Sequence, residues 1–121
     1  MAYYGLSKTE RIKKNREIQA IFEGGRRAVN PYFALHYSQN GLPHNRVGAV
    51  AGRKLGGAVV RNRLKRLLRE VYRRNKHTLC PGYDLVLVAR SKMLGIGLPQ
   101  VEPMFRQIVS QVGLLRSEKE N

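Results

Sequence analysis

One segment of the sequence, residues 58–74 (AVVRNRLKRLLREVYRR), combines strong positive charge with a regular apolar pattern. Seven of its residues are Arg or Lys, and Glu70 is its single acid. On a helix, its main apolar residues fall within about 60° of one another; they are Val60, Leu64, Leu67 and Val71, with Leu68 beside them. Such a stripe must be buried, so the segment predicts a helix that packs on a sheet and presents its cations outward.

The positively charged side chains on the outward face of this helix repel one another. Its polar residues are Arg61, Asn62, Lys65, Arg66, Arg69 and Arg73. Like-charged neighbours at i,i+3 and i,i+4 spacing cost together roughly 1 to 2 kcal/mol, and Glu70 offsets only part of this cost. Because a solvated helix normally alternates its charges, this face favours a polyanionic partner. Arg also suits bidentate contact with phosphate.

The whole chain is basic: 23 Lys and Arg against 8 Asp and Glu give a formal charge of +15 and a pI near 10.8. Nucleic acid, an anionic membrane and an acidic protein all satisfy that charge. A membrane partner is disfavoured, because the apolar stripe of the basic helix is needed for the core. The 121 residues suit one domain spanning 1–121, and the absence of a signal-like or membrane-spanning apolar run predicts a cytoplasmic protein.

Around the basic helix, the spacing of the apolar residues predicts helices in some segments and strands in others. Residues 15–22 predict a short helix that stops at the glycines 24 and 25, and residues 32–38 predict a strand with two different faces. We expect residues 46–51 to pair with that strand in an antiparallel hairpin. Residues 83–90 are apolar enough for a central strand, and residues 101–115 keep a helical period. The pattern is that of an α+β fold.

Residues 54–66 (KLGGAVVRNRLKR) resemble the signature of the protein subunit of bacterial ribonuclease P, with its Arg-Asn-Arg at Arg61, Asn62 and Arg63. The resemblance covers about residues 10–116. It implies a two-layer α/β sandwich in which helices pack a four-stranded sheet. It also implies a left-handed βαβ crossover, although the general rule favours right-handed ones.

The resemblance implies a function as well. Together with a catalytic RNA and Mg²⁺, the family's holoenzyme is an endonuclease that removes the 5′ leader of precursor tRNA. The catalytic groups and most of the bound Mg²⁺ are expected on the RNA, which leaves no catalytic or metal residue on this chain. In agreement, Asp84 is the single Asp, and the glutamates form no pair spaced for metal or acid–base work. The expected partners are the two RNAs, with no membrane and no obligate protein partner.

The family's binding residues can be carried over by position. For the basic helix and the loop before it, the predicted RNA-binding residues are Arg53, Lys54, Arg61, Asn62, Arg63, Lys65, Arg66, Arg69 and Arg73. For the cleft that holds the single-stranded leader, they are Ile18, Phe22, Phe33, His36 and Arg90. Stacking on rings and contact between cations and phosphates suit single strands. Strand alternation puts Phe33 and His36 on opposite faces, so one of these two assignments conflicts with the other.

Two other classes of function fit the charge. A structural RNA-binding protein, such as a ribosomal component, would bind ribosomal RNA without affecting tRNA processing. A binder of duplex DNA would need a helix free to enter the major groove, whereas the basic helix is committed to the sheet. Competition between duplex DNA and single-stranded RNA separates these classes.

Overall fold

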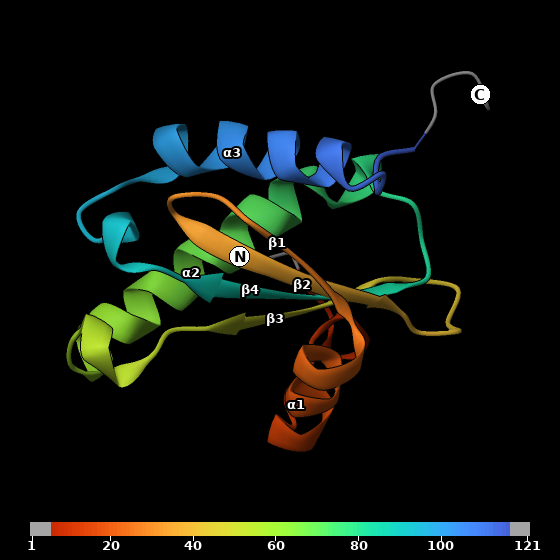
Figure 1. The fold of residues 1–121 in the computed structure, drawn as a ribbon, viewed down its shortest axis with the longest axis horizontal. Coiled ribbons are helices and arrows are strands. Elements are labelled where there is room, and N and C mark those ends of the chain that lie inside the picture. Colours follow the sequence, from red (N-terminus) through yellow and green to blue (C-terminus); the bar gives the residue numbers. More distant parts are fainter. Residues whose placement is uncertain (1–5, 117–121) are drawn as a thin grey trace.

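The computed structural model describes residues 6–116, in which a four-stranded sheet has α1 on one face and α2 and α3 on the other (Figure 1). In chain order the main elements are α1 (Asn15–Gly24), β1 (Arg26–Val29), β2 (Phe33–Gln39), β3 (Arg46–Val50), α2 (Ala58–Asn75), β4 (Tyr83–Ala89) and α3 (Leu98–Gln111). The predicted α+β class is confirmed. Within the described residues, no helix is long and apolar enough to cross a membrane.

The strand order is β1-β2-β4-β3, with every pair antiparallel except the parallel pair of β3 and β4. The predicted central position of residues 83–90 is confirmed, because β4 lies between β2 and β3. The predicted hairpin of residues 32–38 with residues 46–51 is wrong, since β4 separates these strands. The chain passes from β3 through α2 to β4, which gives the expected βαβ crossover; its left-handedness stays a prediction.

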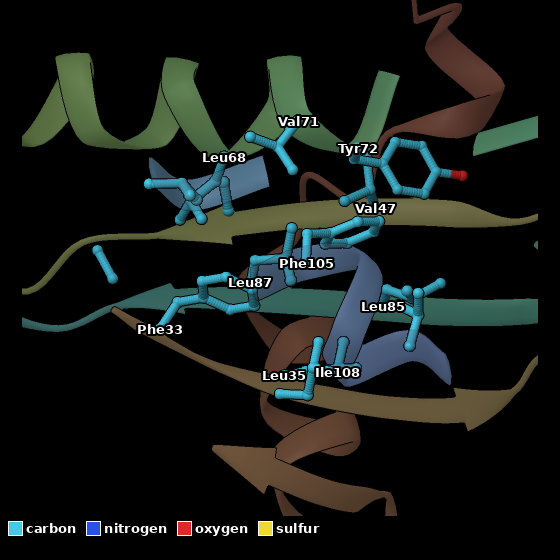
Figure 2. Packing of buried hydrophobic residues seen from close by; sticks show 14 of the residues in the cluster. Phe33, Leu35, Val47, Leu68, Val71, Tyr72, Leu85, Leu87, Phe105 and Ile108 are labelled. Atoms are coloured by element: carbon cyan, nitrogen blue, oxygen red, sulfur yellow. The ribbon is translucent and has the colours of Figure 1, made fainter. Parts of the chain in front are cut away.

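The main core lies between the sheet and the two helices α2 and α3 (Figure 2). Alternate residues of β2 and β4 point into it, and α2 contributes residues from one stripe. Fully buried members include Phe33, Leu35, Leu64, Leu68, Val71, Leu85, Leu87 and Phe105. The buried stripe of α2 is centred on Leu64, Leu68 and Val71, while Val60 and Leu67 at its border are partly buried. The leucines therefore hold α2 on the sheet as its pattern predicted.

A smaller apolar cluster joins α1 to the opposite sheet face. Ile12, Ile21 and Val86 are buried there, and Ile18 and Phe22 pack against them while partly exposed. Because α1 is short, it covers only part of this face. Beside the helix, His36, Val50 and Val88 stay partly exposed on this face, where the leader cleft is predicted.

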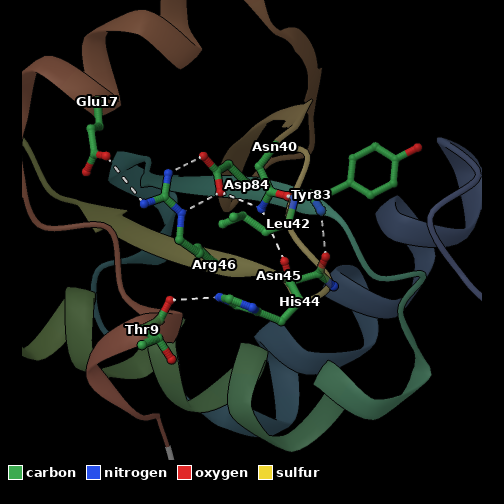
Figure 3. A network of polar contacts seen from close by, with 9 residues as sticks. All are labelled: Thr9, Glu17, Asn40, Leu42, His44, Asn45, Arg46, Tyr83 and Asp84. Atoms are coloured by element: carbon green, nitrogen blue, oxygen red, sulfur yellow. Dashed lines mark hydrogen bonds and ion pairs between the residues drawn. The ribbon is translucent and has the colours of Figure 1, made fainter.

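A polar network ties α1 to the ends of β3 and β4 (Figure 3). Arg46 donates two hydrogen bonds to Asp84, at 2.8 and 2.6 Å, and a third to Glu17 of α1 at 3.3 Å. The amide of Asn40 donates to Asp84 as well, at 2.9 Å. Asp84 is only 6% exposed, and its hydrogen bonds raise the pKa of Arg46. The network fixes α1 relative to the sheet.

Candidate nucleic-acid interface

The cations of α2 differ in how the fold neutralises them. Towards the end of the helix, Arg73 donates to Glu70 at 2.9 and 2.7 Å, and Arg74 donates to Glu102 of α3 at 3.0 Å. The hydrogen bonds from Arg73 lower the pKa of Glu70. The next cation along the chain, Lys76, pairs with Glu10 at 2.9 Å. This end of α2 therefore carries little net charge.

The beginning of α2 is not neutralised. Among residues 6–116, no Asp or Glu pairs with Arg61, Arg63, Lys65 or Arg66. Arg63 and Arg66 are exposed, and so are the predicted Asn62, Arg53 and Lys54. The first turn of α2 contains no acid. Gly57 at the N-cap has no side chain that could accept a hydrogen bond from the free backbone N–H groups of the first turn. Both features favour an anion here, because the helix dipole is positive at this end.

Arg61 carries an unsatisfied polar atom. Its Nε is buried and has no hydrogen-bond partner in the described part of the chain. A buried N–H without a partner costs about 1 to 3 kcal/mol, so the partly exposed Arg61 side chain would be stabilised by turning its Nε–H toward an acceptor on a ligand. Phosphate and ribose oxygens are acceptors of that kind.

A basic groove runs between α2 and the segment before α1. One cavity of about 340 Å³ is lined by Ile18, Lys65 and Arg69, with Arg11 and Lys13 on its other wall. The groove thus joins the predicted cleft residue Ile18 to the predicted helix residues. Arg11 and Lys13 were missed by the sequence analysis, because they lie outside any periodic segment. They reach the groove because the backbone of Ile12 donates to Val47 of β3 at 2.9 Å.

A second cavity, of about 450 Å³, continues the groove along the outer face of α2. Arg11 and Arg69 line both cavities, so the two are adjacent. Arg66 and Arg73 line the second one together with Glu70. A strand of RNA could therefore pass from the sheet to the cations of α2 without leaving a positively charged surface.

Beside the sheet face, Phe22 of α1 lies against His36 of β2, and the two rings contact each other edge to face with centroids 4.6 Å apart. Both side chains are half-buried. Burial lowers the pKa of His36 below its usual 6.5, and the Arg27 cation lowers it further. A neutral imidazole next to a phenyl ring gives this part of the surface an aromatic, weakly polar character that suits contact with a base.

Phe33 is the predicted cleft residue that the structure places elsewhere. It is 0% exposed and packs on Phe105 of α3, with ring centroids 6.4 Å apart. The register of β2 runs without a bulge from Phe33 to Gln39, so Phe33 and His36 face opposite sides of the sheet. Its assignment to the cleft is wrong: Phe33 belongs to the main core.

Arg90 lies just beyond β4 and is exposed. Its backbone N–H donates to Tyr32 at 2.9 Å, and its guanidinium donates to the carbonyl of Asn30 at 3.1 Å. Asn30 in turn accepts from the backbone of Tyr32 and of Phe33. The turn between β1 and β2 therefore holds Arg90 just beyond β4, with the rest of its guanidinium exposed, and its place in the leader cleft stays a prediction.

Comparison with known proteins identifies the family of this chain. The sequence model of the family described as Ribonuclease P matches residues 6–113. The ribonuclease P protein component of Natranaerobius thermophilus is 37% identical over 111 residues, which cover 92% of this chain and 96% of that protein. That of Thermotoga maritima is 40% identical over 88 residues, covering 73% and 75%.

Solved structures give the same result. The RNase P protein of Staphylococcus aureus superposes with a TM-score of 0.80 at 28% identity, over 90% of this chain and 100% of that one. The Thermotoga maritima protein superposes with a TM-score of 0.77 at 33% identity, over 84% and 96%. With sequence and fold in agreement over most of its length, the chain belongs to the ribonuclease P protein family.

Proposed function

We propose that this chain is the protein subunit of ribonuclease P, which binds a catalytic RNA and the 5′ leader of precursor tRNA and so promotes removal of that leader. The observation that carries the proposal is that the fold neutralises the cations at the end of α2 but not those at its beginning. Arg61, Arg63, Lys65 and Arg66 are left without acidic partners within residues 6–116, and Lys65 lines a groove with Ile18, which packs in the same apolar cluster as Phe22. Cations beside stacking rings suit a single RNA strand.

The two surfaces have separate roles in this proposal. The beginning of α2 and the exposed Arg53 and Lys54 before it contact the catalytic RNA. The groove and the sheet face beside α1 hold the leader, with Arg11 and Lys13 added to its phosphate contacts. The Glu17–Arg46–Asp84 network keeps the width of the groove constant, because it fixes α1 on the sheet.

Five of the six carboxylates in residues 6–116 are taken up by cations and so do not fit a magnesium site. Glu10, Glu17, Glu70, Asp84 and Glu102 are each bound to Lys or Arg. In the described residues no group of three His, Cys, Asp or Glu side chains lies close enough to hold a metal ion. The proposal therefore places the required Mg²⁺ on the RNA and assigns this chain the binding and positioning of RNA only.

The test is cleavage of a precursor tRNA by a bacterial ribonuclease P RNA at low Mg²⁺, with and without the protein. We expect strong stimulation and a correctly matured 5′ end. An Arg61→Ala variant should need more protein to reach the same stimulation, whereas Arg106→Ala, on the far helix α3, serves as a control of equal charge change. Tight RNA binding without stimulation would refute the proposal and favour a structural RNA-binding role.

A further inference from the structure

A third pocket, of about 480 Å³, lies at the opposite end of β2 from Arg90. It is bordered by the end of α1, the start of β1 and the last residues of β2, and it shares no lining residue with the two basic cavities. Its volume falls within the usual range for small-molecule sites, about 300 to 1,000 Å³. The proposed function leaves this pocket without a role.

Two tyrosines form its aromatic wall. Tyr37 of β2 and Tyr83 of β4 have ring centroids 6.5 Å apart at an interplanar angle of 54°. Both are half-buried, since each ring packs on the main core while it also lines the pocket. The rings are therefore held in place before any ligand arrives. Fixed aromatic rings of this kind accept a nucleobase with little dependence on its identity.

The edge of β2 supplies hydrogen-bonding groups next to these rings. β1 begins at Arg26, which pairs with Tyr37, so the register leaves Ser38 and Gln39 without a partner in β1. Gln39 is exposed, and both residues line the pocket. An unpaired strand edge offers N–H and C=O groups, and the Gln39 amide adds a donor and an acceptor. These groups match the polar edge of a base.

Arg26 supplies the charge. It is exposed at the rim, and no acidic side chain in residues 6–116 forms an ion pair with it. A cation next to an aromatic wall and a polar strand edge matches the three parts of a nucleotide better than it matches an acidic peptide, which would leave the rings without a function.

We propose that this pocket binds one unpaired nucleotide of an RNA, with its base against Tyr37 and Tyr83, its base edge at Gln39 and its phosphate at Arg26. The proposal rests on the RNA-binding role proposed above and adds a contact on a separate part of the surface. The nucleotide could belong to the catalytic RNA or to the precursor tRNA, and the experiment separates the two.

Gly24 allows a test that removes no existing contact. A Cβ at this position meets no atom within 4 Å, and its backbone is not in the left-handed region. Gly24→Glu and Gly24→Gln therefore place side chains of equal size on the pocket wall, with and without a negative charge. We would titrate labelled full-length protein with AMP, with UMP and with inorganic phosphate, and follow the NMR signals of Tyr37, Tyr83 and Arg26.

We expect AMP and UMP to shift these signals and inorganic phosphate to bind more weakly. Gly24→Glu should bind AMP about fivefold more weakly than Gly24→Gln, from repulsion of the phosphate. Shifts confined to Phe22 and His36 would overturn the pocket while leaving the proposed function intact. Equal affinities for the two variants would overturn the placement of the phosphate.

To learn which RNA supplies the nucleotide, we would compare Arg26→Ala with wild type in two binding assays, with Arg106→Ala as control. One assay measures affinity for the catalytic RNA alone, and the other measures affinity of the preformed holoenzyme for precursor tRNA. A loss of about threefold or more in one assay identifies the RNA involved. No loss in either overturns the proposal. Failure of the proposed function would appear instead as wild-type protein that does not stimulate cleavage.

Discussion

The division of charge along α2 makes a quantitative prediction for Arg66→Gln and Arg74→Gln. Both side chains are exposed Arg on the same helix, and Gln has a similar helix propensity. Arg66 has no acidic partner within residues 6–116, whereas Arg74 is bound to Glu102 at 3.0 Å. Losing one phosphate contact lowers the salt slope of binding by about 0.7 for a single strand and about 0.9 for a duplex. We expect that change for Arg66→Gln and little change for Arg74→Gln.

The assay is the affinity for a bacterial ribonuclease P RNA, measured by filter binding between 50 and 200 mM salt. Over this fourfold range, a slope change of 0.7 to 0.9 makes the loss of affinity about threefold smaller for Arg66→Gln than for wild type. Equal slope changes for the two variants would show that the acidic partners do not decide which cations bind RNA. Unchanged slopes in both would show that Arg66 makes no phosphate contact.

Further predictions follow from the core, the polar network and the titrating groups. Phe33→Ala should destabilise the fold by about 3 to 5 kcal/mol in urea unfolding, because the ring is fully buried. Asp84→Ala should cost about 2 to 4 kcal/mol in the same assay, since Arg46 loses its main partner. The hydrogen bond from Arg74 lowers the pKa of Glu102 below 4.5. The ionised Glu102 therefore stabilises the fold above pH 4.5, and this contribution is lost as the pH falls. Glu102→Gln should make the free energy of unfolding depend less on pH between about pH 5 and 3. The pKa of His36 is also lowered, from 6.5, so stability should fall as the pH drops below 6.5, and His36→Gln should reduce that fall in thermal unfolding.

The elements with strong periodicity were predictable from the sequence. The helix over residues 15–22, the basic helix and the apolar strand over residues 83–90 all appear in the structure. β1 (Arg26–Val29) was not predicted, because it has four residues, begins with two arginines and has little buried surface. Periodicity carries no signal in a strand this short, which forms because residues 26–29 pair with Tyr37 to Ala34 of β2.

The pairing of β3 could not be predicted for a different reason. Asn40, Gly41 and Pro43 give a turn signal, but a turn does not determine whether the next strand pairs with the previous one. In the structure, Asn40 donates to Asp84 of β4 and to the carbonyl of His44. The loop therefore crosses the start of β4 and delivers β3 to its far side. Long-range contacts specify this route, from Asn40 to Asp84 and from Asn45 to Cys80 and Tyr83, and residue spacing does not reveal them.

The cations of the binding surface were predictable from the sequence. Which of them the fold neutralises with acids was not. Six of the eight acids lie in the described residues, and five of them pair with Arg46, Arg73, Arg74, Lys76 or Arg106. All of these cations lie away from the start of α2, where Arg61 to Arg66 keep their full charge. A helical wheel treats every cation on the outward face alike. The tertiary fold distinguishes them, because the acids that neutralise the end of α2 come from α2 itself, from α3 and from the segment before α1. RNA affinity should therefore depend on where the acids are placed as much as on the number of arginines.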